Sequence, residues 1–382
     1  MKEKIAIIDS LGAHGSSFHF YVFGQAKGLS KSGLDVSIYT NNVTNNPHYE
    51  RVKFYQYYKN IFASNSKLIS GFRYICGSLF SLFHARFSGV KICNYHLFHV
   101  NVLVLFDFLL TKMLMMKVVY TIHDVISFEN ANSSQKISNF IYNNADKILT
   151  HNNFSKEIFT KKYNKVLTEI DIVPHGNYLP FLNIKTDKLK SRARLRIPKD
   201  KKVLLFFGII KQVKGLEVLL NALKDVISVN QDIILVIAGR VWKNDFSIYQ
   251  KIIDDNNLSD YCIIHNRWIL HEEVNDYYAS ADLVVLPYKR IYQSGVLLMS
   301  MSYERAVLVS DLPPLTEVVQ DMKTGFVFES ENPKSLSKKL NIIFADTNKL
   351  EEVRVNGFNY IKSKYNWLEI GKETKKSYQS IL

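Results

Sequence analysis

Cysteine is scarce in this sequence. Cys76, Cys93 and Cys262 are the only three among 382 residues, which is too few, and an odd number, for a disulfide framework. Scarce cysteine favours a reducing compartment. A secretion signal is also lacking, because MKEKIAIIDS has a basic start but only a short apolar run before Asp9 and no small-residue cleavage site. We therefore expect a cytoplasmic protein.

Long hydrophobic runs, short-period repeats and low-complexity segments are absent as well. The most apolar zone, 97–110 (LFHVNVLVLFDFLL), is interrupted by His99, Asn101 and Asp107, so it is too short and too polar to span a membrane. A hydrophobic share of 47% is nevertheless enough to fill ordinary cores. A chain of 382 residues is expected to form two or three domains.

Acidic residues are in deficit. Lysine and arginine number 49 against 35 aspartates and glutamates, which gives a formal net charge of +14. A basic protein attracts anions, and nucleic acid, acidic lipid and phosphate-bearing substrates all qualify. The sequence contains no recognition-helix or RNA-binding motif, so a nucleic-acid partner would rest on charge alone and we do not expect one.

Short apolar strands alternate with helical patterns along the whole chain. In the first half the strands are KIAIID, DVSIYT, GVKICNYHLFH, KVVYTIHD, KILTHN and EIDIVPHG. After a polar, basic break at 183–200 the pattern restarts with KKVLLFFG, DIILVIAG, YCIIHN, ADLVVLPY, AVLVSD and GFVFE. Such strands, separated by helices, are typical of parallel sheets covered on both faces. We predict an α/β protein of two doubly wound Rossmann-like domains, joined near 185–200, with sheets that face a central cleft and ligands at the carboxyl ends of the strands.

The loop after the first strand of the second half carries glycine and lysine. The segment LLFFGIIKQVKGLEVLLNAL places Gly208, Lys211, Lys214 and Gly215 between a strand and an amphipathic helix. Loop amides and a helix start present partial positive charge, and the two lysines add full charges, so the pattern is typical of a phosphate-binding loop. It lacks the spacing of P-loop NTPases. A solvated basic turn is the alternative interpretation.

A second candidate loop lies further along the same predicted domain. The stretch KRIYQSGVLLMS places Gln293, Ser294, Gly295 and Val296 at the start of a helix, where amides and a hydroxyl are available and glycine allows close backbone approach. A tight turn with a serine cap explains the same residues. Both loops follow strands of one predicted sheet, so a single diphosphate would bridge them.

In the first half, YTIHDVISFE places His123 and Asp124 directly after a buried strand. A histidine at this end of a strand is suited to bond a sugar hydroxyl or to hold a proton near neutral pH. Alternatively, His123 is a core residue and Asp124 caps the next helix. Cys93, His96 and His99 in CNYHLFH resemble metal ligands, but a structural zinc site needs four ligands and no fourth stands at a suitable spacing. An extended segment also turns Cys93 and His96 to opposite faces, which favours residues of the core or of the cleft rim. We expect no metal site.

The segment SKLISGFRYICGSLFSLFHARFSGVK mixes phenylalanine, leucine and isoleucine with Lys67, Arg73, Arg86 and Lys91. A basic amphipathic helix of this kind lies on anionic membrane surfaces. A domain helix whose apolar side faces the core has the same composition, and the sequence does not decide between the two.

Taken in this order, the motifs resemble nucleotide-sugar glycosyltransferases of the GT-B fold, in particular the retaining GT4 family. The matching pieces span most of the chain: GAHGSS, YTIHD, ILTHNNFSKEIF, IVPHGNY, RARLRIPKDKKVLLFFGIIKQVKGLEVLLNAL, VIAGR, YYASADLVVLPY, QSGVLLMSMSYERAVLVSD, LPPLTEVVQDMKTGFVFE and YNWLEIGKETKKSY. The resemblance implies an acceptor-binding domain over 1–180, a donor-binding domain over 195–360 and a terminal helix over 361–382 that crosses back to the first domain.

The resemblance also implies roles for individual residues. Lys214 stands where the family's lysine contacts the donor diphosphate. The family's arginine after the loop glycine is Ile209 here, and Lys211 takes its place. His123 matches the histidine beside the transferring sugar, with Asp124 next to it. The other matching positions belong to the donor side (Gly208, Gly239, Arg240, Arg267, Trp268, Ile269, Gln293, Ser294, Gly295 and Val296) or, with Asp124, to the acceptor side (Gly12, His14 and Gly15).

One departure concerns the family's paired glutamates, E-x7-E. They would fall at Ile291 and Met299, and neither residue is acidic. The stretch resembles instead a subgroup with a Q-S-G-V loop, in which Ser294 and Gly295 approach the phosphates. Glu317 is a substitute for one glutamate on this interpretation, although it also suits the N-terminal turn of a plain helix.

The resemblance implies a transferase that moves a sugar from a UDP- or GDP-linked donor to a glycan or lipid-linked glycan in cell-surface polysaccharide biosynthesis, with retention of configuration. No cofactor is expected, and since no Asp-x-Asp motif is present, protein charges would replace a divalent metal. A peripheral position at the inner membrane face fits the basic helix. The alternatives are an epimerase on the same architecture and a protein that binds nucleotide sugar or glycan without transfer.

Overall fold

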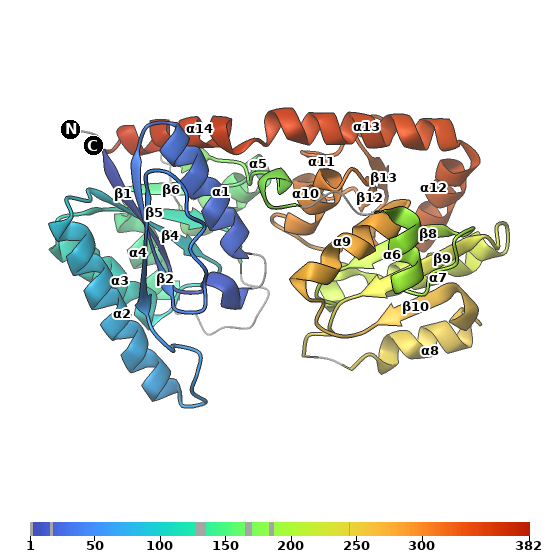
Figure 1. Ribbon diagram of the computed structural model, residues 1–382, viewed down its shortest axis with the longest axis horizontal. Coiled ribbons are helices and arrows are strands. Elements are labelled where there is room, and N and C mark those ends of the chain that lie inside the picture. Colours follow the sequence, from blue (N-terminus) through green and yellow to red (C-terminus); the bar gives the residue numbers. More distant parts are fainter. Residues whose placement is uncertain (1–2, 16–17, 127–134, 165–169, 183–186, 244) are drawn as a thin grey trace. The chain divides into compact units, whose positions relative to one another are not determined.

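The computed structural model describes residues 3–15, 18–126, 135–164, 170–182, 187–243 and 245–382. The chain divides into two compact units (Figure 1). We call residues 1–176 with 365–382 the first domain, and residues 177–364 the second domain. Among the residues described, no helix has the length and apolar character needed to cross a membrane.

The first domain is built on a parallel sheet of seven strands in the order β3-β2-β1-β4-β5-β6-β7. Its strands are β1 (Lys4–Asp9), β2 (Asp35–Asn41), β3 (Val52–Tyr58), β4 (Ile92–Leu97), β5 (Lys117–Ile122), β6 (Lys147–Thr150) and β7 (Ile170–Ile172). Its helices are η1 (Gly12–Gly15), α1 (Phe18–Lys31), α2 (Lys67–Phe87), α3 (Val102–Met113), α4 (Gln135–Asn144), α5 (Asn153–Tyr163) and α14 (Trp367–Gln379).

The second domain repeats the plan with six parallel strands in the order β10-β9-β8-β11-β12-β13. They are β8 (Lys202–Phe207), β9 (Ile233–Ala238), β10 (Cys262–His265), β11 (Leu283–Leu286), β12 (Ala306–Ser310) and β13 (Phe326–Phe328). The helical elements are η3 (Leu179–Phe181), α6 (Lys188–Arg194), η4 (Gln212–Lys214), α7 (Leu216–Ile227), α8 (Ser247–Asp255), η5 (Ser259–Tyr261), α9 (His271–Ser280), α10 (Gly295–Ser302), α11 (Pro313–Thr316), α12 (Pro333–Ala345) and α13 (Thr347–Lys364).

The strand order reverses direction once in each sheet. In the first domain β1 pairs with β2 on one side and with β4 on the other, and in the second domain β8 lies between β9 and β11. The inner strands, such as β5 and β9, are almost entirely buried because helices cover both faces, which is why they read as continuous apolar runs, whereas the edge strands β3 and β10 are partly exposed. Two doubly wound α/β domains are therefore confirmed, and each reversal point opens a position for a ligand at the carboxyl ends of the strands.

The basic segment that separates the two sequence patterns forms α6 and is packed within the second domain. Its Arg192 is buried, donates to the carbonyl oxygens of Ser280, Lys199 and Lys201, and pairs with Asp282 at 2.8 Å. A helix anchored in this way is part of the domain rather than a free linker.

The last helix, α14, packs against α1 in the first domain. A β-carbon added at Gly24 would lie 2.1 Å from the Trp367 ring, and one added at Gly28 would lie 2.0 Å from the Trp367 carbonyl oxygen. The two glycines therefore allow the C-terminal helix to approach α1 at backbone distance.

Candidate functional site

In the second domain, the loops after β8 and β11 are tied together at the reversal of the strand order. The amide of Lys289 donates to the carbonyl of Val213 at 2.9 Å. Gly215 has a φ of +66°, and an added β-carbon there would lie 1.9 Å from the carbonyl oxygen of Pro287. Only glycine fits this approach. The two loops that the sequence analysis singled out are thus neighbours in space.

The N-terminus of α10 faces the same place. Gly208, with a φ of +106°, lies beside the first turn of α10, since its added β-carbon would contact Val296 Cγ2 at 3.5 Å. Ser294 is the N-cap, and its Oγ accepts from the amide of Leu297 at 3.1 Å. The amide nitrogen of Gln293 is buried with no hydrogen-bond partner among the described residues. Helix amides, the Ser294 hydroxyl and an unsatisfied donor therefore gather at the start of α10, where a helix N-terminus favours an anion.

The two lysines of the β8 loop lie against different aromatic rings. Lys214 Nζ is 3.7 Å from the centre of the Tyr288 ring, on the β11 side, and Lys211 Nζ is 5.3 Å from the Trp242 ring, on the β9 side. Cation–π contacts of this kind hold an ammonium group in place. Lys289 forms an ion pair with Glu217. The sequence analysis expected both lysines at one diphosphate, and that role stays a prediction.

The loops after β9 and β10 continue the same edge of the sheet. The amide of Gly239 donates to His265 at 3.1 Å, and Arg240, which follows it, is exposed. Arg267 pairs with Glu273 at 2.5 Å, while the Trp268 ring is 45% exposed and Ile269 is half-buried. An exposed indole at the end of a parallel strand is suited to stack on a nucleobase, which is the assignment that the resemblance implied.

The positions of the missing family glutamates are apolar in structure as well as in sequence. Ile291 is 8% exposed and Met299 is 9% exposed. A carboxylate at either position would be buried, which costs free energy unless a partner compensates the charge. Glu317 lies at the C-terminal end of α11, so its interpretation as an N-terminal helix acid is not what the structure shows.

In the first domain, the carboxyl ends of four strands bring four histidines together. His96 is in β4, and His123, His151 and His175 follow β5, β6 and β7. His96 Nδ1 lies 3.1 Å from His123 Nε2, and His123 Nδ1 lies 3.1 Å from His151 Nε2. At one end of this chain of hydrogen bonds, His151 Nδ1 lies 2.9 Å from the carbonyl oxygen of Val173. At the other end, His96 Nε2 lies 3.1 Å from the side-chain amide of Gln25.

Proton counting fixes the tautomers of this chain. The Val173 carbonyl only accepts, so His151 donates from Nδ1 and accepts at Nε2. His123 then donates from Nδ1 to His151, and His96 donates from Nδ1 to His123. The remaining His96 Nε2 is an acceptor, so it requires the amide nitrogen of Gln25 rather than the amide oxygen. That nitrogen is otherwise buried without a partner among the described residues. Since amide oxygen and nitrogen are interchangeable in placement, we assign the nitrogen to the side of His96.

Burial keeps this chain neutral. Desolvation lowers the pKa of His96 to about 3 and that of His151 to about 4, and it holds the pKa of His123 well below its usual range. Neighbouring imidazoles lower the pKa of His96 and His123 further. Both ring nitrogens of His123 are occupied by other histidines, and the ring is 6% exposed. A contact of His123 with substrate stays a prediction, and His96 is the member of the chain that is only half-buried.

Sequence reasoning identified His123 and missed its partners. His96 was considered only as a metal ligand, and His151 and His175 were not considered. The signal was available, because each follows or ends a predicted parallel strand and such ends meet along one edge of the sheet. No group of three or more metal-ligating side chains is present in the described part of the chain.

The glycine-bearing first loop forms η1. Gly12 has a φ of +47°, and its amide donates to Asp9 Oδ1 at 3.0 Å. His14 is exposed with its ring 4.4 Å from that of Phe62. Gly15 ends η1, and Asp124 is half-buried beside His123. The loop and the histidines therefore both lie at the carboxyl ends of the strands of the first sheet.

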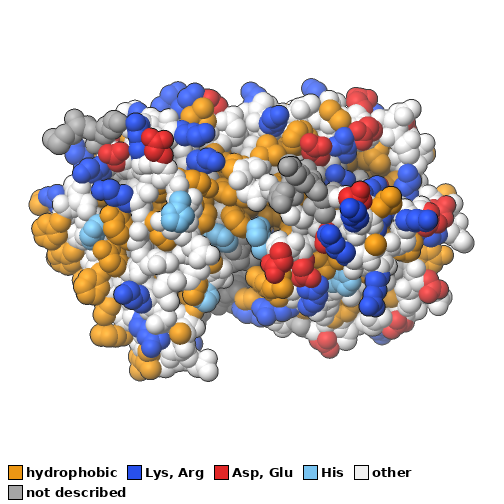
Figure 2. Space-filling model, in the orientation of Figure 1, with side chains coloured by type: hydrophobic (Ala, Val, Ile, Leu, Met, Phe, Trp, Pro, Cys, Tyr) orange, Lys and Arg blue, Asp and Glu red, His pale blue; other side chains and the backbone are white. Residues whose placement is uncertain are grey.

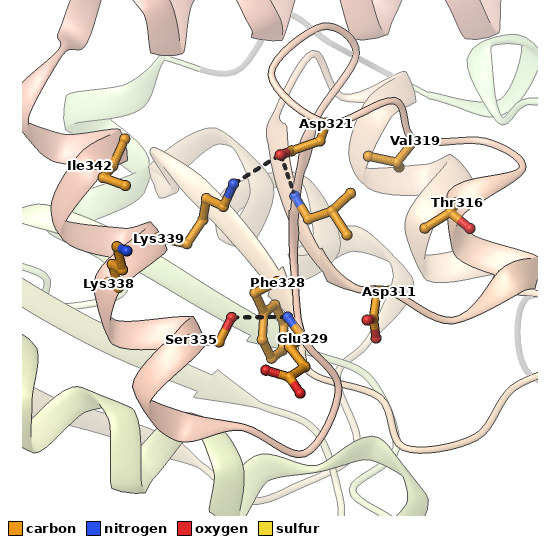
Figure 3. Close-up of a pocket in the computed structure, with 11 residues that line it drawn as sticks. Asp311, Thr316, Val319, Asp321, Phe328, Glu329, Ser335, Lys338, Lys339 and Ile342 are labelled. Atoms are coloured by element: carbon orange, nitrogen blue, oxygen red, sulfur yellow. Dashed lines mark hydrogen bonds and ion pairs between the residues drawn. The ribbon is translucent and has the colours of Figure 1, made fainter.

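A separate hollow of about 610 Å³ lies in the second domain beside β13 and α12 (Figure 3). Asp321 accepts there from Lys339 at 2.9 Å and from the amide of Val327 at 2.8 Å, and Ser335 accepts from the amide of Glu329 at 3.0 Å. These polar groups bond to one another, and none of the predicted site residues lines the hollow. It contributes nothing to the candidate site.

Comparison with known proteins agrees with this geometry. Residues 187–360 match the family model of glycosyl transferases group 1. A relative named as glycosyltransferase YtcC, from Bacillus subtilis (strain 168), is 25% identical over 280 residues. The aligned part covers 68% of this chain and 67% of the length of YtcC. The lipopolysaccharide 1,2-N-acetylglucosaminetransferase of Salmonella typhimurium is 26% identical over 232 residues, 59% of each chain. The chain spans 48% to 67% of the length of these and similar curated relatives.

Solved structures extend the likeness to the whole chain. Sucrose-phosphate synthase from Thermosynechococcus elongatus is 18% identical with a TM-score of 0.76, covering 100% of this chain and 99% of its own. Anabaena HepE in complex with UDP-glucose is 14% identical with a TM-score of 0.77, covering 99% of both. At these identities the likeness concerns the fold, so the predicted GT-B fold is confirmed. Membership of the GT4 subgroup stays a prediction.

Proposed function

We propose that this protein transfers a sugar from a nucleoside diphosphate sugar, bound on the second domain, to a hydroxyl of a glycan or lipid-linked glycan. The observation that carries the proposal is the meeting of the β8 loop with the N-terminus of α10 at the strand reversal, where Ser294 and Gly208 border one position. The group 1 match over this domain supports it. The relatives named for lipopolysaccharide and glycolipid transfer support a cell-surface product.

The chemistry follows from the charges. When the bond between the anomeric carbon and the phosphate breaks, negative charge grows on the leaving diphosphate. Lys211, Lys214 and the amides from Ser294 to Val296 stabilise that charge without a divalent metal, and preorganised groups of this kind are usually the largest catalytic term. Retention of configuration is part of the proposal by resemblance to the family. Chelator-resistant turnover and NMR of the product's anomeric proton test these two points.

Lys214 gives the sharpest test of the donor site. Replacing it by methionine (Lys214→Met) keeps the length of the side chain but removes the charge, so transfer is expected to fall by about 10²–10³-fold with the fold intact. Lys224→Met is the matched control, because Lys224 is exposed near the far end of the adjoining helix α7. Turnover of UDP- and GDP-sugars is measured, together with thermal shifts on adding UDP or GDP. Equal turnover in both variants would remove Lys214 from the mechanism.

Binding without transfer is a second candidate function, favoured by the apolar Ile291 and Met299. A binding protein would show thermal shifts with donor and glycan but no turnover of either. An epimerase would convert the donor with no acceptor added. Measuring donor consumption with and without acceptor separates these outcomes from transfer.

The surface of the first domain supports an acceptor held at a membrane. Along α2, Leu68 is 87% exposed, Phe72 69%, Phe80 66% and Phe87 84%. Lys67, Arg73 and Arg86 lie on the same helix, which has no acidic residue. Figure 2 shows hydrophobic side chains among lysines and arginines at the left-hand edge, over α2 and α3. We propose that this α2 surface rests on anionic lipid, as interfacial helices do.

A further inference from the structure

A pocket of about 480 Å³ lies at the strand reversal of the first domain. It runs from the carboxyl ends of β1 and β4 to the space between α2 and α3, and we call it the α2–α3 pocket. Its walls are mainly apolar, with Leu11, Phe62, Phe98, Leu103 and Val104 among them. His96, the half-buried end of the histidine chain, also lines it. The pocket thus adjoins the position where the resemblance places the acceptor.

Two buried carboxyl groups line this apolar pocket. Asp107 is 2% exposed, and its Oδ2 accepts a hydrogen bond from Tyr74 Oη at 2.5 Å. Its other oxygen, Oδ1, receives no hydrogen bond of ordinary geometry from the described residues. Ser78 is nevertheless close enough to lower the pKa of Asp107. Asp9 is 4% exposed and accepts from the amide of Gly12. Burial raises the pKa of Asp9 to about 6 and that of Asp107 to about 7. An unsatisfied buried oxygen costs free energy that a ligand hydroxyl would recover.

The shape of α2 leaves room in the pocket. Lys67, Ser70, Gly71 and Tyr74 recur at helical spacing along the lined face, opposite to the exposed Phe72 and Phe80. A β-carbon added at Gly71 would meet nothing within 4 Å. Glycine weakens a helix interior relative to alanine, and no backbone approach requires it here. The gap at Gly71 therefore enlarges the pocket at the expense of the helix.

We propose that the α2–α3 pocket binds a neutral amphiphile, with hydroxyl groups on Asp107 and Asp9 and a hydrocarbon portion against the apolar walls. Where Asp9 and Asp107 are ionised, they disfavour a phosphate or carboxylate beside them, because like charges repel at low dielectric. Lys67, which also lines the pocket, is exposed to solvent. In one respect this proposal rests on the proposed function. It takes the amphiphile to be the sugar acceptor, or the part of the acceptor nearest the reacting hydroxyl. The pocket face of α2 lies opposite to its exposed apolar face, so a molecule that leaves a membrane beside α2 reaches the pocket around a single helix.

Binding is tested with the full chain and without donor, by calorimetric titration of n-octyl β-D-glucoside below its micelle concentration. Glucose lacks the hydrocarbon tail, and octyl phosphate lacks the neutral hydroxylated head group. Each is expected to bind at least about tenfold more weakly than octyl glucoside. Asp107→Asn is expected to weaken octyl glucoside by a similar factor. Equal binding of octyl phosphate would contradict the assigned chemistry.

Gly71 supplies the decisive variants. Gly71→Leu places a side chain in the pocket and is expected to weaken the binding of octyl glucoside by roughly tenfold to hundredfold. The midpoint of thermal unfolding is expected to stay equal or to rise, because leucine is a better helix former than glycine. Gly71→Ala is the matched control, with the same gain in the helix and little obstruction. Unchanged affinity in Gly71→Leu would overturn the proposal.

The two proposals fail in different ways. If transfer to octyl glucoside proceeds equally in wild type and Gly71→Leu, the pocket assignment is wrong and the transferase stands. If octyl glucoside binds as expected but no donor sugar is consumed with any acceptor, the pocket stands and the proposed reaction is wrong.

Discussion

The buried histidines of the first domain make its stability depend on pH. An imidazole whose pKa is lower in the folded chain than in the unfolded chain binds fewer protons when folded. Stability is therefore complete above the unfolded value, near 6.5, and is lost as pH falls toward the folded values of about 3 to 4 for His96, His151 and His175. Each such group contributes a slope of about 1.4 kcal/mol per pH unit in that window.

Asp9 and Asp107 act in the opposite direction. Their folded pKa values, about 6 and about 7, lie above the ordinary aspartate value, so the folded chain keeps protons that the unfolded chain has released. With four histidines against two carboxyl groups, near pH 5 we expect the free energy of unfolding to fall by about 3 kcal/mol per pH unit on acidification. Urea titrations at several pH values measure the slope.

The same titrations on Asp107→Asn supply the control. Removing one opposing group steepens the slope by about 1.4 kcal/mol per pH unit. A wild-type slope near pH 5 of only about 1.4 kcal/mol per pH unit would mean that one histidine of the chain already holds an extra proton at neutral pH, with Gln25 presenting its amide oxygen instead.

Residue identity alone predicted part of the candidate site. The glycines at 208 and 215 were predicted as loop residues from their place after an apolar strand, and their positive φ angles agree. The aromatic rings under Lys211 and Lys214 were not predicted, because Trp242 and Tyr288 follow other strands and no sequence spacing joins them to the β8 loop. The two buried carboxyl groups were missed for a similar reason, since Asp107 was considered only as an interruption of an apolar run.

At the scale of elements, two helical glycines give a matched pair. Gly28 of α1 supports the close approach of α14, and an added β-carbon would lie 2.0 Å from a backbone oxygen of Trp367. Gly71 of α2 faces open space. Gly28→Ala is expected to destabilise the chain by about 1–3 kcal/mol through overpacking, although alanine is the better helix former. Gly71→Ala is expected to stabilise it by about 0.5–1 kcal/mol.

Chemical denaturation of both variants checks the pair. Helix propensity has the same sign at both positions, so any difference in sign comes from packing against α14. If both substitutions stabilise the chain, α14 is not held at backbone distance from α1. Sequence reading predicted a terminal helix over 361–382 by resemblance, but the packing of Trp367 over Gly24 is a tertiary feature that helical periodicity does not encode.

At the scale of the whole molecule, the alternation of strands and helices was sufficient to predict two doubly wound domains. Fully buried parallel strands leave a clear signal, since each is a short apolar run, and in β5, β8 and β9 the run is followed directly by histidine or glycine. The segment 183–200 was expected to join the domains because it is polar and basic. From Lys188 it forms α6, whose buried Arg192 bonds to Asp282 inside the second domain. Composition shows a charge but not the partner that satisfies it.

The net charge of +14 and the α2 surface together predict selective membrane binding. Vesicles rich in phosphatidylglycerol are expected to bind the protein, and phosphatidylcholine vesicles are expected to bind it weakly, because each basic residue near an anionic surface contributes about 1 kcal/mol. Raising salt from about 0.1 M to about 1 M shortens the Debye length from about 10 Å to about 3 Å. This change is expected to release most of the bound protein from the phosphatidylglycerol vesicles. Co-sedimentation measures the bound fraction.

The hydrophobic part of this interaction is separable from the charge. The double variant Phe72→Ser and Phe80→Ser removes two exposed rings and leaves every charge in place, so binding is expected to weaken by roughly tenfold or more even at low salt. Phe140→Ser is the matched control, because Phe140 is 47% exposed on α4 of the same domain and lies outside the α2 surface. If both variants bind alike, the rings of α2 do not enter the lipid and charge alone attracts the protein. Since the rings lie on the face of α2 opposite to the pocket, octyl glucoside affinity should stay unchanged in the double variant, which separates membrane contact from acceptor binding.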